Sequence, residues 1–454
     1  MLIPIACVAV ICWLILSLIN KRSANVSPHE ISSLTRIGPM ALFRDVMGYT
    51  SKVRRLVGDV FTVWFLGKKV TFVFGQENVQ SVMRASNDIV NFEDGYATFF
   101  LSAFGDGVLT KSLSGKQMKL VRQFLSPDCL SSYLRPTFKL ADQILREELP
   151  DEGIADLNPV IFRTAFSLGT RNFLGDDFIF ALKHYDFKGI TSGLTSPFRV
   201  AVELTPLAGL ARIYDAWKPK SDFDKDIDLI RQRRLENDSH ANMLDAIFNT
   251  PDAFDNNTRA MYHLVRVLVF GTGFTSYHSL VYLLREVLAV PWLWNQLQDE
   301  QWKVASQYSE ICEEKLKAMK LLTACITEVM RINAAPFLIR KTLQSFTLPS
   351  GDVIPPGNLV AVSPTIEHRE NHSNATKFDP FRERESFMMH FGFGKHACPG
   401  EKYSMNNMRI VMSHLLTEFQ MELVESEPVT NKQLVSFPLQ SAISVRYLRI
   451  DKSE

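Results

Sequence analysis

The sequence predicts a mainly α-helical protein with a small β region, preceded by an N-terminal transmembrane helix. Helix-period apolar patterns dominate the chain from about Ser114 to Glu300. Short β-branched runs separated by Gly and Pro occur before and after that region. An uncharged run of eighteen residues lies near the start. With 46% apolar and 22% charged residues among 454, the chain is suited to a large folded core and is unlike a disordered protein.

The charges and cysteines exclude several classes of function. The 50 basic residues are balanced by 49 acidic ones, for a net charge of +1, and they are spread along the chain. No basic stripe for phosphates is formed, so no nucleic-acid partner is expected. Two of the six cysteines lie in the N-terminal apolar run, and the others are scattered without a CxxC or Cys/His zinc spacing. This pattern favours a reducing compartment for the body of the protein.

The N-terminal run, LIPIACVAVICWLILSLI over residues 2–19, is long enough to span a hydrocarbon core of about 30 Å. A cleavable signal peptide is the alternative, but Lys21 and Arg22 follow the run instead of preceding it, and no small-residue cleavage site follows. By the positive-inside bias, these charges keep the C-terminal side in the cytosol. We therefore expect a membrane anchor at 1–22 and a single domain over 23–454.

The first element after the anchor is a predicted β-hairpin over Gly58–Gly75, where two β-branched runs flank Gly67-Lys68-Lys69. The run FTLPSGDVIPPGNLVAVS, punctuated by Pro and Gly, predicts further short strands. Between these regions, the periodicity predicts helices over Lys116–Leu125, Leu134–Glu147, Arg259–Val290 and Pro291–Ser306.

The predicted helix Arg259–Val290 is much longer than most globular helices. Its centre, Leu264–Leu284, is apolar on nearly every face, so it is either a second membrane span or a fully buried helix. Small and polar residues interrupt this centre, which favours a buried helix with a ligand or cofactor close to it. These residues are Gly271, Thr272, Gly273, Thr275, Ser276 and His278.

The ten residues FGFGKHACPG, from Phe391 to Gly400, place Cys398 in a glycine-rich loop. Gly392 and Gly394 let the backbone approach something flat, and the N–H groups of the loop can point at the sulfur. A structural cysteine in a tight turn is the alternative. The full string, however, resembles the cysteine-ligand loop of the cytochrome P-450 family, Phe-x-x-Gly-x-x-x-Cys-x-Gly, and it fills every fixed position.

Two upstream segments extend this resemblance. Glu328 and Arg331 stand three residues apart in a helical context and can pair, which would ordinarily indicate an exposed surface pair. Their spacing is similar to the family's ExxR motif. The segment 378–382 resembles the family's Phe-x-Pro-x-Arg motif, although Glu383 follows where an aromatic residue is common. The resemblance implies that Arg382 completes a buried Glu-Arg-Arg cluster that locks the cysteine loop and takes no part in the reaction.

The resemblance implies the cytochrome P-450 fold and haem b held by the Cys398 thiolate, which is the axial iron ligand. By motif position it also assigns haem contacts to Arg122, Arg340, His396 and Tyr96. For the two arginines, the alternative is an ordinary surface charge.

The family's central helix carries (Ala/Gly)-Gly-x-(Asp/Glu)-Thr-(Thr/Ser), whereas residues 271–276 read GTGFTS. The alcohols Thr275 and Ser276 are the catalytic candidates, but Phe274 stands at the acid position and cannot relay a proton. Either the alcohols and ordered water suffice, or the enzyme carries out rearrangement, desaturation or peroxide chemistry. His278 could substitute for the acid, although a histidine at that depth is more commonly a packing residue.

The expected activity is a monooxygenase acting on a lipophilic small molecule, either terpenoid- or steroid-like or another specialised metabolite. The segment 59–75 is similar to sterol demethylases, and the loop sequence KHACPG is similar to fungal biosynthetic members of the family. The resemblance implies an NADPH-cytochrome reductase as partner and an endoplasmic reticulum location. A non-catalytic haem or lipid binder is the alternative from another class. The substrate is expected to contact Thr191–Leu207, Ala334–Ile339 and Phe437–Ser441.

Overall fold

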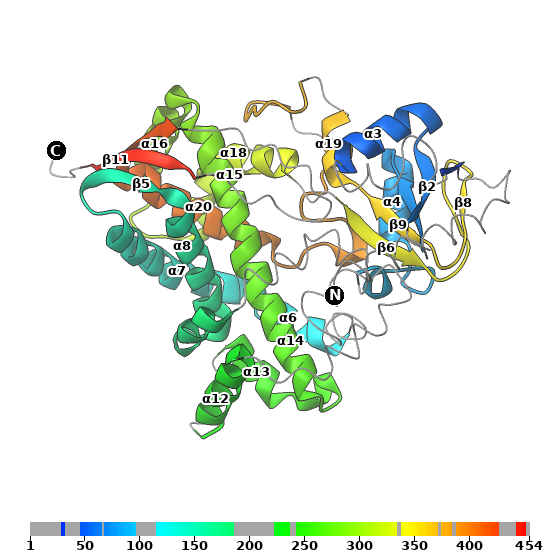
Figure 1. The fold of residues 1–454 in the computed structure, drawn as a ribbon. Coiled ribbons are helices and arrows are strands. Elements are labelled where there is room, and N and C mark those ends of the chain that lie inside the picture. The colour runs from blue at the N-terminus through cyan, green and yellow to red at the C-terminus, as the bar shows by residue number, and fades with distance from the viewer. Residues whose placement is uncertain are drawn as a thin grey trace, which may run out of the picture.

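One long helix, from Thr258 to Leu288, crosses the molecule between a helical region and a sheet region (Figure 1). The structure is a computed structural model that describes residues 29–31, 46–65, 68–96, 115–185, 222–236, 242–333, 337–370, 374–383, 387–425 and 442–450. The predicted anchor at 1–22 lies outside these residues. The mainly helical fold with a small β region is confirmed.

The long helix consists of α14 (Thr258–Val269), a π-helical turn η3 (Phe270–Phe274) and α15 (Thr275–Leu288). Among the described residues, it is the one helix that is long and apolar enough to cross a membrane. However, 56% of its most apolar window is buried inside the protein. The buried-helix interpretation is therefore the better one. A π-turn inside an α-helix commonly marks a functional site.

Close packing against α8 (Leu157–Leu174) fixes the position of this π-turn. A Cβ on Gly169 of α8 would lie 2.5 Å from Thr272 Oγ1. A Cβ on Gly273 would lie 2.6 Å from the ring of Phe166. Both positions require glycine, because any side chain there would push the two helices apart.

The other predicted helices are confirmed to within two residues at each end, except for the start of α7. Helix α7 begins at Pro127, seven residues before the predicted start, because the Ser126 side chain accepts from the Cys129 amide and Pro127 occupies the first turn. The helices of this region are α6 (Lys116–Gln123), α7 (Pro127–Glu148), η1 (Asp176–His184), α12 (Asp222–Glu236), α13 (Met243–Asn249), η2 (Pro251–Phe254), α16 (Pro291–Gln307), α17 (Glu313–Ala318), α18 (Lys320–Ile332) and α20 (Glu401–Glu418).

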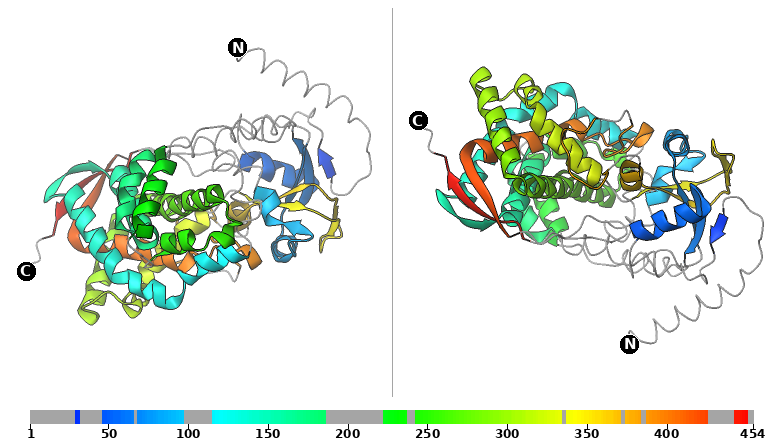
Figure 2. Two further views of the ribbon diagram at one scale, coloured as in Figure 1. Left: turned by 90° about the horizontal axis from the view of Figure 1, so that it is seen from below. Right: turned by 90° about the horizontal axis from the view of Figure 1, so that it is seen from above.

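The sheet region lies at the opposite end of the molecule (Figure 2). The predicted hairpin is β2 (Val60–Phe65) paired antiparallel with β3 (Lys68–Val73), so Lys68 and Lys69 begin the second strand and are not part of the turn. The six-stranded order is β1-β2-β3-β9-β6-β4. The remaining elements of this region are β1 (His29–Ile31), α3 (Val46–Val57), α4 (Gln76–Arg84), β4 (Val90–Asn91), β6 (Leu338–Thr342), β9 (Leu359–Val362) and α19 (Pro364–Glu370).

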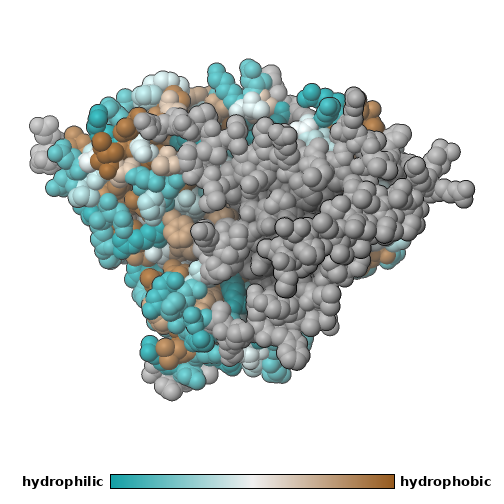
Figure 3. Space-filling model, viewed as in Figure 1, coloured by the Kyte–Doolittle hydropathy of each residue, from teal (hydrophilic) through white to brown (hydrophobic). Residues whose placement is uncertain are grey.

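Two smaller sheets complete the fold. Strands β7 (Phe346–Thr347) and β8 (Val353–Ile354) form a two-stranded sheet, as the Pro- and Gly-rich sequence predicts. Strands β10 (Phe419–Glu425), β11 (Ser444–Arg449) and β5 (Glu152–Asp156) form an antiparallel sheet beside α20. Hydrophilic and hydrophobic residues are interspersed over the coloured part of the face seen in Figure 3. The largest apolar core cluster lies around α15, α16, α18 and α20.

Candidate active site

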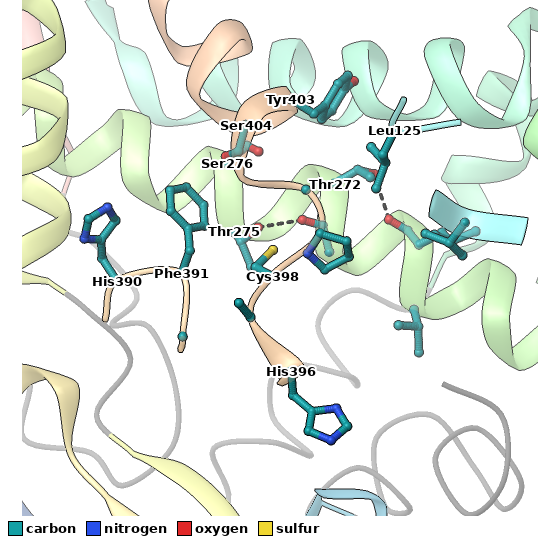
Figure 4. A pocket seen from close by; sticks show the side chains of 18 of the residues that line it. Leu125, Thr272, Thr275, Ser276, His390, Phe391, His396, Cys398, Tyr403 and Ser404 are labelled. Carbon is teal, nitrogen blue, oxygen red and sulfur yellow. Dashed lines mark hydrogen bonds between the residues drawn. The ribbon is translucent and has the colours of Figure 1, made fainter. Parts of the chain in front are cut away.

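A cavity of about 460 Å³ lies between the long helix and the glycine-rich loop. Cys398 lines it on the loop side, and Thr275 and Ser276 line it on the helix side (Figure 4). The loop and the helix are more than a hundred residues apart in sequence. The fold thus brings three of the predicted site residues to one cavity of a size typical for small-molecule binding.

The backbone of the loop holds Cys398 in place. Its amide donates to the Phe391 carbonyl at 2.7 Å, which closes the loop. Gly394 has a φ of 72°, and a Cβ at that position would collide with the backbone carbonyl of Met83. Only glycine combines this left-handed conformation with such a close approach.

The Cys398 thiol is exposed because it faces the cavity. The surrounding protein nevertheless excludes enough water to raise its pKa, while a hydrogen bond from the Gly400 amide acts in the opposite direction. An amide that points at the sulfur stabilises its anionic form, as a thiolate ligand requires.

Glu328, Arg331 and Arg382 form one charge cluster behind the loop. Arg331 binds the Glu328 carboxylate through two hydrogen bonds of 2.8 and 2.9 Å, and Arg382 Nε reaches the same carboxylate at 3.2 Å. Arg331 is only 2% exposed. The pair is therefore not the exposed surface pair that its spacing alone would suggest.

The ionised state of Glu328 depends on these partners. Burial alone would raise the pKa of Glu328, but the hydrogen bonds and charges of Arg331 and Arg382, with the amide of Asp379, outweigh it and lower the pKa. Arg331 also donates to the carbonyls of His368 at 3.0 Å and Ala375 at 2.7 Å. The cluster thereby ties α18 to the two segments that follow the sheet.

Arg340 lies on β6 at the opposite edge of the cavity and is 3% exposed, so it is not an ordinary surface charge. Its guanidinium lies 4.7 Å from the ring centre of Phe92 and 6.0 Å from that of Tyr96. Burial lowers the pKa of Arg340. Among the described residues, no carboxylate lies within salt-bridge distance of it, so this buried cation is suited to an anionic ligand.

The remaining predicted contacts also line the cavity. His396 stacks on Phe92 with the rings 4.5 Å apart, and its Nε2 lies 2.7 Å from Asn87 Oδ1. Burial and the charge of Arg340 lower the pKa of His396. Arg122, in the last turn of α6, is exposed and lines the cavity, and Tyr96 is half-buried beside Arg340. Asn87 was not predicted, since an isolated asparagine forms no recognisable pattern.

The central helix presents hydroxyl groups to the cavity. Thr275 Oγ1 donates to the Gly271 carbonyl at 2.5 Å, and Thr272 Oγ1 donates to the Leu268 carbonyl at 2.7 Å (Figure 4). With its proton committed to the backbone, the Thr275 oxygen presents a lone pair to other donors. Thr272 occupies the position where the family pattern has its second glycine.

The acid position faces away from this cavity. Phe274 is 3% exposed and packs in the core against Phe270, with ring centres 4.7 Å apart, and against His278, at 4.2 Å. Burial lowers the pKa of His278 to about 3, and the residue does not line the cavity. Its burial and its position outside the cavity lining favour the interpretation of His278 as a packing residue over a role as substitute for the missing acid.

The chain belongs to the cytochrome P-450 family, because the family model matches residues 28–443. It is a monooxygenase of that family and binds haem through a cysteine thiolate. It is similar to the sterol 14-demethylase of Arabidopsis thaliana, with 24% identity over 87% of this chain and 85% of that protein. The lanosterol 14-alpha demethylase of Cunninghamella elegans is 20% identical over 92% of this chain and 89% of its own length. The beta-amyrin 6-beta-monooxygenase of Solanum lycopersicum is 25% identical over 69% of this chain and 68% of its own length.

The residues around the cavity fit haem. A thiol suited to iron faces the cavity, and the buried Arg340 is suited to an acidic group at the edge of a porphyrin. A Cβ on Gly271 would meet nothing within 4 Å, so the central helix leaves open space on this side. The thiol, the buried arginine and the open space beside the central helix thus agree with the cofactor of the family.

Two of the predicted substrate-contacting segments, Thr191–Leu207 and Phe437–Ser441, lie outside the described residues. Of Ala334–Ile339, the structure describes the last three residues, and Leu338 lines the cavity. The apolar wall that sequence analysis missed comes from separate helices and includes Met118, Val121, Leu125, Phe173, Met243, Leu264 and Leu268. No sequence signal joins these residues, because only the fold brings them together.

Proposed function

We propose that the protein is a membrane-anchored haem-thiolate monooxygenase that oxidises a lipophilic small molecule, terpenoid- or steroid-like or another specialised metabolite, in a biosynthetic pathway. Cys398 is the iron ligand. The observation that carries this proposal is the position of Cys398 opposite Thr275 across a mainly apolar cavity. When bound, haem supplies the activation of dioxygen, and the thiolate favours cleavage of the oxygen–oxygen bond.

The protein's own residues bind the cofactor and orient proton-bearing groups beside it. Arg122, Arg340, His396 and Tyr96 would hold the acidic edge of the cofactor. On the opposite wall, Thr275 offers its oxygen as an acceptor for a proton-bearing group, because its own hydrogen is bonded to the Gly271 carbonyl. Ser276 lies beside it on the same wall and completes the pair of alcohols.

The substrate class follows from the cavity wall and is supported by the relatives. The wall opposite the loop is formed mainly by aliphatic, methionine and phenylalanine side chains, which favour an apolar skeleton over a charged one. Proteins named for sterol and beta-amyrin oxidation are among those that the chain resembles. A panel of sterols and triterpenes is therefore the first set of substrates to test.

The proposal is tested by the carbon monoxide difference spectrum of the reduced recombinant protein beside a Cys398→Ala control. We expect a strongly red-shifted Soret band that is lost in the control. Haem-loaded, folded wild-type protein without this band would contradict the assignment of Cys398. Substrate-induced shifts of the ferric Soret band then rank the panel.

A second candidate function is rearrangement, desaturation or peroxide chemistry at the same cofactor. The observation that favours it is Phe274, which puts a buried aromatic ring where the family pattern has an acid. Product mass separates insertion, which adds one oxygen atom, from rearrangement, which leaves the mass unchanged, and from desaturation, which removes two hydrogen atoms. Turnover with hydrogen peroxide in place of NADPH and reductase identifies peroxide chemistry.

The membrane anchor, the single domain over 23–454, the endoplasmic reticulum location and the NADPH-cytochrome reductase belong to the same proposal. The uncharged run at 2–19, followed by Lys21 and Arg22, supports an anchor with the domain in the cytosol. We expect deletion of 1–22 to release the protein from membranes in carbonate extraction. Product formation that depends on NADPH and added reductase tests the partner.

A further inference from the structure

His368 on α19 connects the buried charge cluster to the cysteine loop. It is 2% exposed, and it exchanges hydrogen bonds with Arg331 in both directions. Arg331 Nη1 donates to the His368 carbonyl at 3.0 Å, and His368 Nδ1 lies 3.3 Å from the Arg331 carbonyl. The two residues, 37 positions apart in sequence, therefore fix each other's backbone and side chain.

The other ring nitrogen faces the cysteine loop. The Met389 amide donates to His368 Nε2 at 2.9 Å, and Met389 is itself fully buried. The Met389 carbonyl in turn accepts from the Gly392 amide at 2.9 Å, and Gly392 lies in the loop that carries Cys398. Three consecutive hydrogen bonds thus lead from the Glu328–Arg331 pair to the loop.

The donors and acceptors in these hydrogen bonds determine the tautomer of the His368 imidazole. A backbone N–H can only donate, so Nε2 must be the unprotonated acceptor, and the single ring proton is on Nδ1. That proton is directed to the Arg331 carbonyl. Arg331 lies in the last turn of α18, where carbonyls have no partner within their own helix. One neutral ring satisfies two backbone groups that would otherwise be buried unpaired.

We propose that His368 is a positioning residue for the thiolate ligand. It transmits the fixed geometry of the Glu328–Arg331–Arg382 cluster, through Met389 and Gly392, to the loop that holds Cys398. This inference rests on the proposed ligation of iron by Cys398. Loss of the Nε2 acceptor leaves the Met389 amide unpaired and lets the loop relax away from the geometry that the sulfur needs.

The experiment compares three variants of the haem-loaded full chain. His368→Gln keeps an acceptor near the Nε2 position, His368→Asn keeps a polar group only near the Nδ1 position, and His368→Phe removes both. His414→Phe is the matched control, because His414 is also buried and bonds the Phe138 carbonyl at 3.1 Å, but it lies far along α20 from the loop. Each variant is measured for haem content, melting temperature and the red-shifted fraction of the carbon monoxide spectrum.

We expect the Phe and Asn variants to shift the equilibrium toward the form without thiolate ligation by about tenfold, and the Gln variant to recover most of the red-shifted band. The control should lower the melting temperature without changing the band. A full red-shifted band in the Asn variant, or an equal loss in the Gln and Phe variants, would overturn the inference. If wild-type protein itself lacked the band, the proposed function would fail instead, so the two failures are distinguishable.

Discussion

The cysteine loop and the central groove, defined as the cavity-facing side of residues 271–276, face each other across one cavity but hold their polar groups differently. Behind the loop, a buried carboxylate and two arginines form direct ion pairs. In the groove, hydroxyls bond to carbonyls of their own helix, and no charged side chain of α14, η3 or α15 lines the cavity. Buried charge thus holds the segments behind the loop, whereas the long helix presents hydroxyl groups and apolar side chains to the cavity and no charged side chain.

The largest effect is expected from breaking the charge cluster with Glu328→Gln. The variant leaves Arg331 buried without its carboxylate, and we expect a loss of about 3–5 kcal/mol in the free energy of unfolding. Chemical denaturation monitored by circular dichroism measures it. Glu310→Gln removes the partner of the exposed Arg135 and should leave the unfolding free energy nearly unchanged. Equal losses in the two variants would show that the cluster does not differ from a surface pair.

The next effect concerns the core-facing side of the same helical segment, where Phe274→Asp would restore the family's acid. Because the side chain points into an aromatic cluster, we expect a loss of about 2–4 kcal/mol at pH 8 instead of a gain in proton delivery. Phe274→Leu, which keeps the site apolar, should lose about 1 kcal/mol.

The pH dependence of Phe274→Asp separates charge from packing. Burial raises the pKa of the new carboxyl in the folded state, so its ionisation penalty is absent at low pH and complete above the folded-state pKa. The difference between the Asp and Leu variants should therefore grow from pH 5 to pH 8. A constant difference would mean that the Asp side chain reaches water, and the groove would then resemble the loop side more closely.

A smaller effect is expected from His278, the buried imidazole next to Phe274. Its pKa of about 3 lies below the usual value of 6.5. As the pH falls below 6.5, the imidazole is therefore protonated in the unfolded chain but stays neutral in the folded protein. At pH 5 this linkage costs about 2 kcal/mol of stability. His278→Leu should reduce the loss of unfolding free energy between pH 8 and pH 5 by about that amount. An unchanged pH dependence would show that the imidazole titrates normally.

The smallest effect is expected where the groove packs against α8. Gly169→Ala places a methyl group against Thr272 and should cost about 1–2 kcal/mol. The double variant Gly169→Ala/Thr272→Gly removes the atoms that collide and should be more stable than the sum of the two single variants predicts. Thermal unfolding of the four proteins gives the coupling energy. Simple additivity would argue that the Gly169–Thr272 contact does not set the position of the groove.

Much of the fold could be predicted from the sequence, because local patterns reflect local physics. The hairpin at Gly58–Gly75 follows from alternating β-branched runs, and the long helix follows from its period. The start of α7 could not be predicted in this way, because capping by Ser126 and Pro127 outweighs a weak apolar pattern. The π-turn at Phe270–Phe274 was also missed, since it depends on packing against α8.

The candidate site, like the fold, was predictable from the sequence in some features and not in others. The sequence by itself determined Cys398 and its glycine-rich loop, the identity of the Glu328, Arg331 and Arg382 partners and the departure at Phe274, because each belongs to a contiguous motif. Only the tertiary structure decided that Phe274 and His278 point into the core and that His368 connects the cluster to the loop. The physical reason is that burial and long-range hydrogen bonds depend on how distant segments pack, and this information is not present in the spacing of any one segment.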